Sequence, residues 1–183
     1  MSNIKYLILS IGVMLYSCVS TEIQPPTTSG FFDLNNFIEK EIADKSDAIS
    51  TFRKTVTLDG VTETQELSSF NLVEELKVFS DANINKTAWL DRYAVDSIFS
   101  KAKVLEKIKY QALKEDLRTQ ELSIIFNSEK VDTIYIVQKS NNLLASAAQN
   151  LTYIPAYGYK IENLQEITSL DPHKLSVDVM FVR

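Results

Sequence analysis

Residues 104 to 182 form a nearly continuous series of short segments in which apolar and polar residues alternate. The clearest are Val131–Gln138 (VDTIYIVQ) and Leu175–Val182 (LSVDVMFV). A period of two places every second side chain on the same face of a strand. The series therefore predicts consecutive strands with one buried face and one wetter face. The expected segments are 104–113, 120–126, 131–138, 143–154, 159–167 and 175–182, of which 143–154 is compatible with either a strand or a short helical turn at its start.

A helical pattern precedes this series. Asp33 is a candidate N-cap, and Phe32 and Phe37 have the spacing of a hydrophobic staple. Apolar residues then recur at helical spacing, which predicts an amphipathic helix at about 33–46. The members of its apolar stripe are Leu34, Phe37, Ile38 and Ile42.

A hairpin and a second helix are expected next. Asp59-Gly60 separates two segments rich in Thr and Val, and this pair favours the positive φ angles of a type I′ turn. Asn71 and Glu74 have capping-box spacing and predict the start of a short helix. Its expected apolar face consists of Leu72, Val73, Leu76 and Phe79. Residues 80–100 show no clear period and are interpreted as a packed irregular loop.

This order of elements predicts the fold class. Helices that are separated from a run of strands indicate an α+β domain with an antiparallel sheet. Neighbouring strands are expected to pair as a meander, and a long sheet of this kind twists strongly. We therefore expect a curved antiparallel sheet, a meander or half-barrel, packed against two N-terminal helices in a single domain over residues 31–183.

The first seventeen residues differ from this domain. Lys5 precedes a ten-residue apolar run, Tyr6–Leu15, which is shorter than the roughly 20 residues of a membrane-spanning helix. This length is typical of the apolar region of a signal peptide. Leu15-Tyr16-Ser17-Cys18 follows and resembles the lipobox of bacterial lipoproteins, although Tyr16 is larger than the usual residue there. The resemblance implies cleavage after residue 17 and acylation of Cys18, the only cysteine of the chain. A plain cleaved signal peptide and an uncleaved anchor are the alternatives.

Residues 18–30 are expected to form a flexible tether that carries the lipid. Pro25-Pro26 favours extended geometry, and the stretch contains no helix or strand pattern. In enteric lipoproteins, Asp directly after the lipidated Cys favours retention in the inner membrane. This chain has Val19 there, which by resemblance implies that the protein is located at the periplasmic face of an outer membrane.

Composition excludes several classes of function. The formal net charge of −5 argues against nucleic acid and against charge-driven binding to anionic lipids. One His and one Cys do not provide a metal site, and no cofactor is expected. With only four glycines, a Gly-rich phosphate cradle is not expected, and no G-x-S-x-G, G-x-G-x-x-G or P-loop pattern occurs. His173 is expected to be an exposed turn residue.

A few candidate site residues remain. Aromatic side chains near loops or strand ends are candidates for contact with a ligand or partner, or for filling the rim of the core. They are Trp89, Tyr93, Tyr157 and Tyr159. Ser97, within Asp96-Ser97-Ile98, fits a pattern that resembles the O-glycosylation acceptor of Bacteroidota. Paired carboxylates suggest a hydrolase only if a cleft brings them together. The candidates are Glu39, Glu41, Asp44, Glu74 and Glu75.

The lipobox, the Pro-containing tether and the helix–hairpin–helix–strand order resemble the small envelope lipoproteins of Bacteroidota. The resemblance implies attachment to a membrane through Cys18 and brings no activity with it. Three functions stay open. The first is a non-catalytic module that binds an envelope protein or assists envelope assembly. The second is a carrier or sensor of a lipid or another hydrophobic ligand, and the third is a carboxylate-dependent hydrolase of glycan or peptidoglycan.

Overall fold

The computed structural model describes residues 30–182, apart from Asp47, Ser50 and Ser69. The helices are α1 (Leu34–Ser46), α2 (Leu72–Ser80) and the 3-10 helix η1 (Thr87–Trp89). The strands are β1 (Thr51–Leu58), β2 (Val61–Leu67), β3 (Tyr93–Phe99), β4 (Leu105–Ala112), β5 (Thr119–Asn127), β6 (Lys130–Asn141), β7 (Ala145–Ile154), β8 (Gly158–Ile167) and β9 (His173–Val182).

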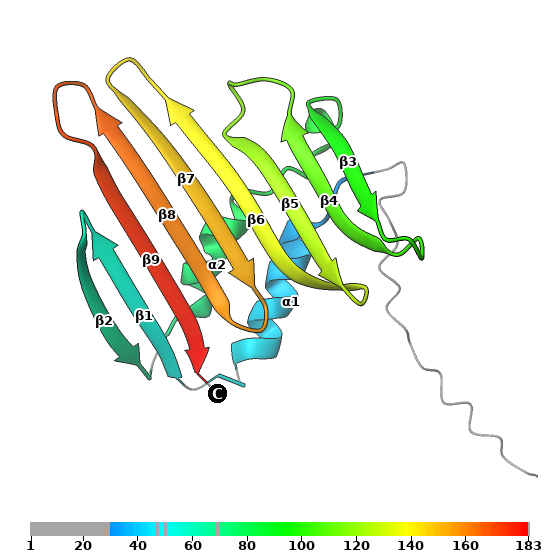
Figure 1. The fold of residues 1–183 in the computed structure, drawn as a ribbon, viewed down its shortest axis with the longest axis horizontal. Helices are drawn as coiled ribbons and strands as arrows, with labels where there is room; N and C mark the ends of the chain where they lie inside the picture. Colours follow the sequence, from blue (N-terminus) through cyan, green and yellow to red (C-terminus); the bar gives the residue numbers. More distant parts are fainter. Residues whose placement is uncertain (1–29, 47, 50, 69, 183) are drawn as a thin grey trace, which may run out of the picture.

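The strands join one antiparallel sheet in the order β2-β1-β9-β8-β7-β6-β5-β4-β3 (Figure 1). From β3 to β9 each strand pairs with the next one along the chain, which confirms the expected meander. The β1–β2 hairpin does not start that meander. Instead, β1 pairs antiparallel with β9, from Thr51–Val182 to Leu58–Leu175. The N-terminal hairpin and the last strand are therefore neighbours in space.

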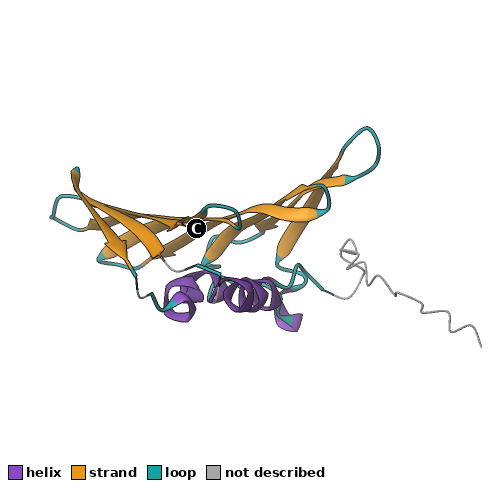
Figure 2. Cartoon of the chain, turned by 90° about the horizontal axis from the view of Figure 1, so that it is seen from below, coloured by secondary structure: helices purple, strands orange, loops and turns teal. Residues whose placement is uncertain are grey.

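Both α-helices lie on one face of the sheet, and the opposite face carries no helix in the described part of the chain (Figure 2). We call the covered side the helix face and the other side the open face. The expected fold class is confirmed: the protein is α+β, with a curved, open antiparallel sheet and two N-terminal helices.

Local sequence signals account for the helix starts. The Asp33 carboxylate accepts a hydrogen bond from the backbone N–H of Asn36 at 3.1 Å, and the Phe32 and Phe37 ring centroids are 5.8 Å apart. In α2, the Asn71 side chain accepts from the Glu74 N–H at 3.3 Å. Each bond satisfies one backbone donor that the first helical turn leaves without a partner.

Tight turns follow the same logic. Asp59 and Gly60 have φ values of 49° and 89°, as a type I′ turn requires. The β5–β6 connection is tighter than the four-residue loop expected at 127–130. Its two central residues, Ser128 and Glu129, have φ values of 50° and 64°. Two non-glycine residues with positive φ therefore form this turn, and no glycine marks it in the sequence.

Two expectations were wrong. Residues 93–99 form strand β3 and not a packed loop. Strand β3 is at the edge of the sheet. Most of its side chains are exposed, whichever face of the sheet they project from. No alternating pattern therefore marks it in the sequence. Val73 was assigned to the apolar face of α2, but it is 57% exposed, whereas Leu72, Leu76 and Phe79 are buried.

The core lies between the helices and the sheet. Phe79 of α2 packs edge-on against the rings of Tyr153 and Tyr159, with ring centroids 5.7 and 5.9 Å away. Tyr153 also contacts Phe181 of β9. Burial of these apolar surfaces supplies most of the favourable free energy of folding. The large side chains that are at most 1% exposed are Leu34, Ile38, Leu76, Phe79, Ile84, Tyr110, Leu122, Ile124, Ile134, Ile136, Leu151, Tyr153, Tyr159 and Val179.

Candidate functional site

Two Tyr–Glu–Lys groups attach the helices to the sheet. The Tyr153 hydroxyl donates to Glu41 of α1 at 2.7 Å, and Lys45 contacts the same carboxylate oxygen at 2.7 Å. Burial, and then the hydrogen bond and charge of Glu41, raise the pKa of Tyr153 well above its usual value. The phenol therefore stays protonated and keeps donating to the carboxylate.

The second group repeats this arrangement on α2. The Tyr159 hydroxyl donates to Glu75, and Lys54 of β1 contacts the other carboxylate oxygen of Glu75 at 3.0 Å. Burial, and then Glu75, raise the pKa of Tyr159 above its usual value. Tyr153 and Tyr159 are cross-strand partners in β7 and β8. Each therefore fixes one helix above the same point of the sheet.

These contacts bear on the carboxylate hypothesis. Glycoside hydrolysis needs two carboxylates that face a substrate cleft, one of them able to give up a proton. Glu41 and Glu75 each accept from a tyrosine and pair with a lysine, so their oxygens are engaged in holding the helices. Glu39, Asp44 and Glu74 are exposed on the outer surfaces of the helices. The geometry gives Glu41 and Glu75 a structural role.

The four aromatic candidates do not form one site. Tyr93 is 4% exposed and donates its hydroxyl to the Thr119 carbonyl at 2.8 Å, and burial raises its pKa to about 12. Tyr159 is 1% exposed on the helix face, so neither tyrosine is accessible to a partner. Trp89 packs against Tyr93, with the Lys86 ammonium 4.0 Å from its ring centroid.

Tyr157 is the exposed member of the set, in the turn between β7 and β8. It is 39% exposed, and its hydroxyl donates to Asp178 on the open face at 3.0 Å. Ser97 lies on edge strand β3 opposite Ile108, with its side chain half-buried. Cys18 lies outside the described residues.

The single histidine fixes a turn. His173 Nδ1 lies 2.8 Å from an Asp59 carboxylate oxygen, and the other oxygen accepts from the Lys174 N–H at 2.8 Å. These two hydrogen bonds, His173 first, lower the pKa of Asp59. They link the β1–β2 turn to the start of β9. As expected, His173 is exposed, although it begins a strand.

Within the described ranges no three His, Cys, Asp or Glu residues are grouped as a metal would require.

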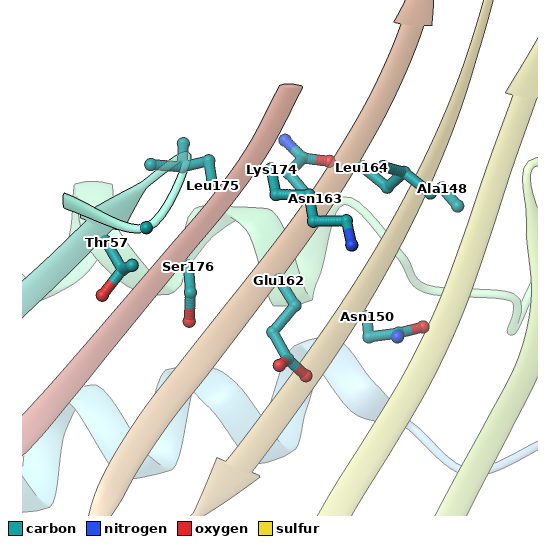
Figure 3. Close-up of a pocket in the computed structure, with 10 residues that line it drawn as sticks. Thr57, Ala148, Asn150, Glu162, Asn163, Leu164, Lys174, Leu175 and Ser176 are labelled. Atoms are coloured by element: carbon teal, nitrogen blue, oxygen red, sulfur yellow. The ribbon is translucent and has the colours of Figure 1, made fainter. Parts of the chain in front are cut away.

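The open face carries a shallow depression of about 410 Å³ across β1, β9, β8 and β7 (Figure 3). Its lining combines polar and small side chains with two leucines, Leu164 and Leu175, and Glu162 and Lys174 bring one charge of each sign. A second hollow of about 220 Å³ shares Ala148 and Leu164 with it and extends it to β6. The residues that line the first hollow are Thr57, Gly60, Ala148, Asn150, Glu162, Asn163, Leu164, Lys174, Leu175 and Ser176.

Strand register explains why these residues meet. Asn150, Glu162 and Ser176 are successive cross-strand partners, and Ser176 is in turn opposite Thr57. Ala148 and Leu164 form the adjacent pair, with Lys174 next to them. Because alternate side chains share a face, these two rows all project away from the helices. The small side chains of Ala148, Ser176 and Thr57 in these rows leave the depression.

Two ion pairs lie on the open face around the depression. Arg53 and Glu66 lie 2.7 Å apart, as do Lys160 and Glu162. Further along the open face, Glu121 accepts from Lys109 and from Ser123. Burial alone would raise the pKa of Glu121, but these two hydrogen bonds and the charges of Lys109 and Lys107 together outweigh burial and lower the pKa. The face therefore offers hydrogen-bonding groups with a balanced charge.

Sequence reasoning missed this site. Alternation predicted which side chains lie on the wetter face of each strand, but it did not predict which strands are neighbours. The polar alternate positions are in 146–152, 160–166 and 174–178. No family model matches the chain, and comparison with curated protein sequences finds no match. None of the helices in the described part of the chain is long and apolar enough to cross a membrane. A function must therefore be inferred from the residues themselves.

Proposed function

We propose that this chain is a non-catalytic envelope lipoprotein, anchored through Cys18, that binds another envelope protein through the open face of its sheet. The observation that carries the proposal is the depression across β1, β9, β8 and β7. It is wide and shallow, and hydroxyl, amide and small side chains line it together with Leu164, Leu175 and one charge of each sign. Such a surface suits a partner that supplies both apolar and hydrogen-bonding groups and that carries little net charge at the contact.

The size of the open face is compatible with a protein partner. A standard interface buries about 800 Å² on each side. The depression and its extension cross five neighbouring strands, and strands in a sheet lie about 4.8 Å apart. A partner seated there would also reach Tyr157, whose hydroxyl is held by Asp178 on the same face.

The alternative of a hydrophobic-ligand carrier has less support. A carrier needs an apolar cavity of several hundred Å³, most naturally between the curved sheet and the helices. In this protein Phe79, Tyr153 and Tyr159 occupy that space in mutual edge-on contact and are at most 1% exposed. Opening a cavity there would require separating both Tyr–Glu contacts.

Site-specific photocrosslinking in native membranes tests the proposal. A photoreactive amino acid at Asn150, in the depression, is expected to give a discrete protein adduct. The same probe at Glu39, on the exposed side of α1, is expected to give none. Ala148→Arg places a long charged side chain in the depression and should abolish the adduct. Val73→Arg, at an exposed position of α2, is the matched control and should leave it unchanged.

Two outcomes would overturn the proposal. One is an adduct pattern that is the same from both probe positions and is insensitive to Ala148→Arg. The other is a stoichiometric hydrophobic molecule that co-purifies with both the full-length protein and its Cys18→Ser variant, which would favour the carrier. Mass spectrometry of the same preparation measures acylation of Cys18, so the anchor is tested separately from the binding surface.

A further inference from the structure

Strand direction gathers the exposed leucines at one end of the sheet. Because the strands alternate in direction, five connections come to this end: β1–β2, η1–β3, β4–β5, β6–β7 and β8–β9 (Figure 1). The described part of the chain has six leucines that are at least 40% exposed, and all six lie in or beside these connections. We call this end the leucine end. Its leucines are Leu58, Leu90, Leu113, Leu143, Leu144 and Leu170.

Two of these connections are held in place by hydrogen bonds. The Asn142 side chain accepts from the N–H groups of Leu144 and Ala145 at 2.9 and 2.8 Å, which leaves Leu143 95% exposed at the tip. The Leu144 carbonyl in turn accepts from the N–H and hydroxyl of Thr168 in the β8–β9 connection. The connection that carries Leu143 and Leu144 is thus bonded to the connection that carries Leu170. Exposed apolar groups that are gathered on one surface commonly mark a site that binds a protein or a membrane.

The chain enters the domain at the same end. The Phe31 N–H donates to Asn85 at 3.1 Å and the Phe32 N–H donates to the Tyr110 hydroxyl at 2.9 Å. The Phe31 ring packs against Tyr93, the first residue of β3, with centroids 5.9 Å apart. The segment that joins Cys18 to the domain therefore meets it at the leucine end.

The length of that segment limits where the domain can lie. Gly30 is twelve positions after Cys18, and a fully extended chain spans at most about 3.6 Å per position, or roughly 40 Å. That reach is close to the width of nine strands spaced about 4.8 Å apart. An anchored domain is thus confined within about its own width of the bilayer, which gives the loops a high effective concentration at the membrane surface.

We infer that the leucine end rests on the lipid bilayer, with the leucines of its loops inserted into the interfacial region. A bilayer is planar, and the five connections lie side by side at one end of the strands of a single sheet. The longest of them, 113–118, carries Lys114 and Arg118 together with Glu115 and Asp116, so its charge is balanced. We therefore expect this end to bind the bilayer through its apolar side chains and not through charge attraction to anionic headgroups. The inference rests on the proposed membrane anchor but not on the proposed protein partner.

This orientation places the depression beside the bilayer surface. The depression lies on a face of the sheet, whereas the bilayer would meet the strand ends, and Gly60 and Lys174 of its lining lie next to the β1–β2 and β8–β9 connections. A partner on the open face would therefore lie next to the membrane.

Fluorescent probes at two ends of the sheet test the orientation. The full-length protein is reconstituted into phosphatidylethanolamine vesicles with or without phosphatidylglycerol. An environment-sensitive dye is attached to Leu143→Cys and, in a second sample, to Val104→Cys in the β3–β4 hairpin at the opposite end, which is 38% exposed. The dye at 143 should shift to the blue and be quenched by spin-labelled acyl chains, equally in both lipid mixtures. The dye at 104 should report water.

A second measurement separates apolar insertion from mere proximity. Leu144→Ser and Leu170→Ser, in the protein labelled at 143, should each lower the ratio of inserted to free dye by roughly tenfold, because burying one leucine shifts an equilibrium by at least that factor. Val73→Ser, an exposed apolar position on α2, should leave the ratio unchanged.

Three results would overturn the inference. The dye at 143 could stay in water in a protein whose Cys18 carries acyl chains. That result would support the lipid anchor but contradict contact between the leucine end and the bilayer. The dye at 104 could enter the lipid instead. Finally, the dye at 143 could be shielded only when a co-purified protein is present, which would assign the leucines to that protein. Mass spectrometry of Cys18 in each sample reports on the anchor independently of all three.

Discussion

Raising the pH above about 10 should destabilise this protein, because Tyr153 and Tyr159 cannot ionise where they lie. Both are buried, and each donates its hydroxyl to a carboxylate. Burial, and then Glu41 or Glu75, raise their pKa values above the usual value of tyrosine. In the unfolded chain the same phenols ionise near pH 10.

The sign and size of the effect follow from proton linkage. A raised pKa in the folded state means that the contribution to stability is complete below about pH 10 and is lost as the pH rises through the folded-state pKa. Each tyrosine then lowers the free energy of unfolding by about 1.4 kcal/mol per pH unit. The two together remove about 3 kcal/mol at pH 11, a large part of the 5–15 kcal/mol that stabilises a typical domain.

Urea denaturation at a series of pH values measures this, with the fluorescence of the single tryptophan as the signal. The Tyr153→Phe/Tyr159→Phe variant should start less stable at pH 7, since each lost hydrogen bond to a charged group costs about 1.5–3 kcal/mol. Its stability should then fall less steeply above pH 10. Tyr157→Phe is the control, because Tyr157 is exposed. Equal alkaline slopes in the double variant and the parent would refute the reasoning. The loss of stability would then come from other groups that lose a proton in the same range, such as the lysines and the buried Tyr93.

Three further predictions concern stability, each measured by the same denaturation assay. Gly158→Ala should unfold the domain or cost more than about 4 kcal/mol, because the added Cβ would lie 1.9 Å from a backbone carbonyl oxygen of β9 at a φ of +145°. Gly60→Ala, also at positive φ but with nothing within 4 Å, should cost only about 1–2 kcal/mol, and equal costs would contradict the steric argument. Phe79→Ala should cost about 3–5 kcal/mol by emptying the space between the two helix-facing tyrosines, whereas Val73→Ala on the exposed side of the same helix should stay within about 0.5 kcal/mol. Asn71→Ala should cost about 1 kcal/mol through loss of the α2 cap, and a stability unchanged from the parent would show that the cap bond contributes nothing.

The extent of sequence-based prediction differs between the fold and the site. Helix α1, the β1–β2 hairpin and most of the meander were predicted, because each is specified by periodicity or turn chemistry within a few residues. Edge strand β3 was missed because exposure on both faces removes the alternation that marks a strand. The depression was missed because it needs the register of four strands at once. Lipidation of Cys18 and glycosylation of Ser97 stay predictions.

The sequence by itself determined the local geometry of this protein. Asp33 and Asn71 start the helices, and Asp59-Gly60 turns the first hairpin, since each of these signals acts on backbone groups within four residues. Only the tertiary structure decided that β1 pairs with β9, that Tyr159 is buried against α2, and that the exposed leucines share one end. Those features depend on strand order and direction across the whole sheet. They are set by long-range pairing and burial, which no short stretch of sequence encodes.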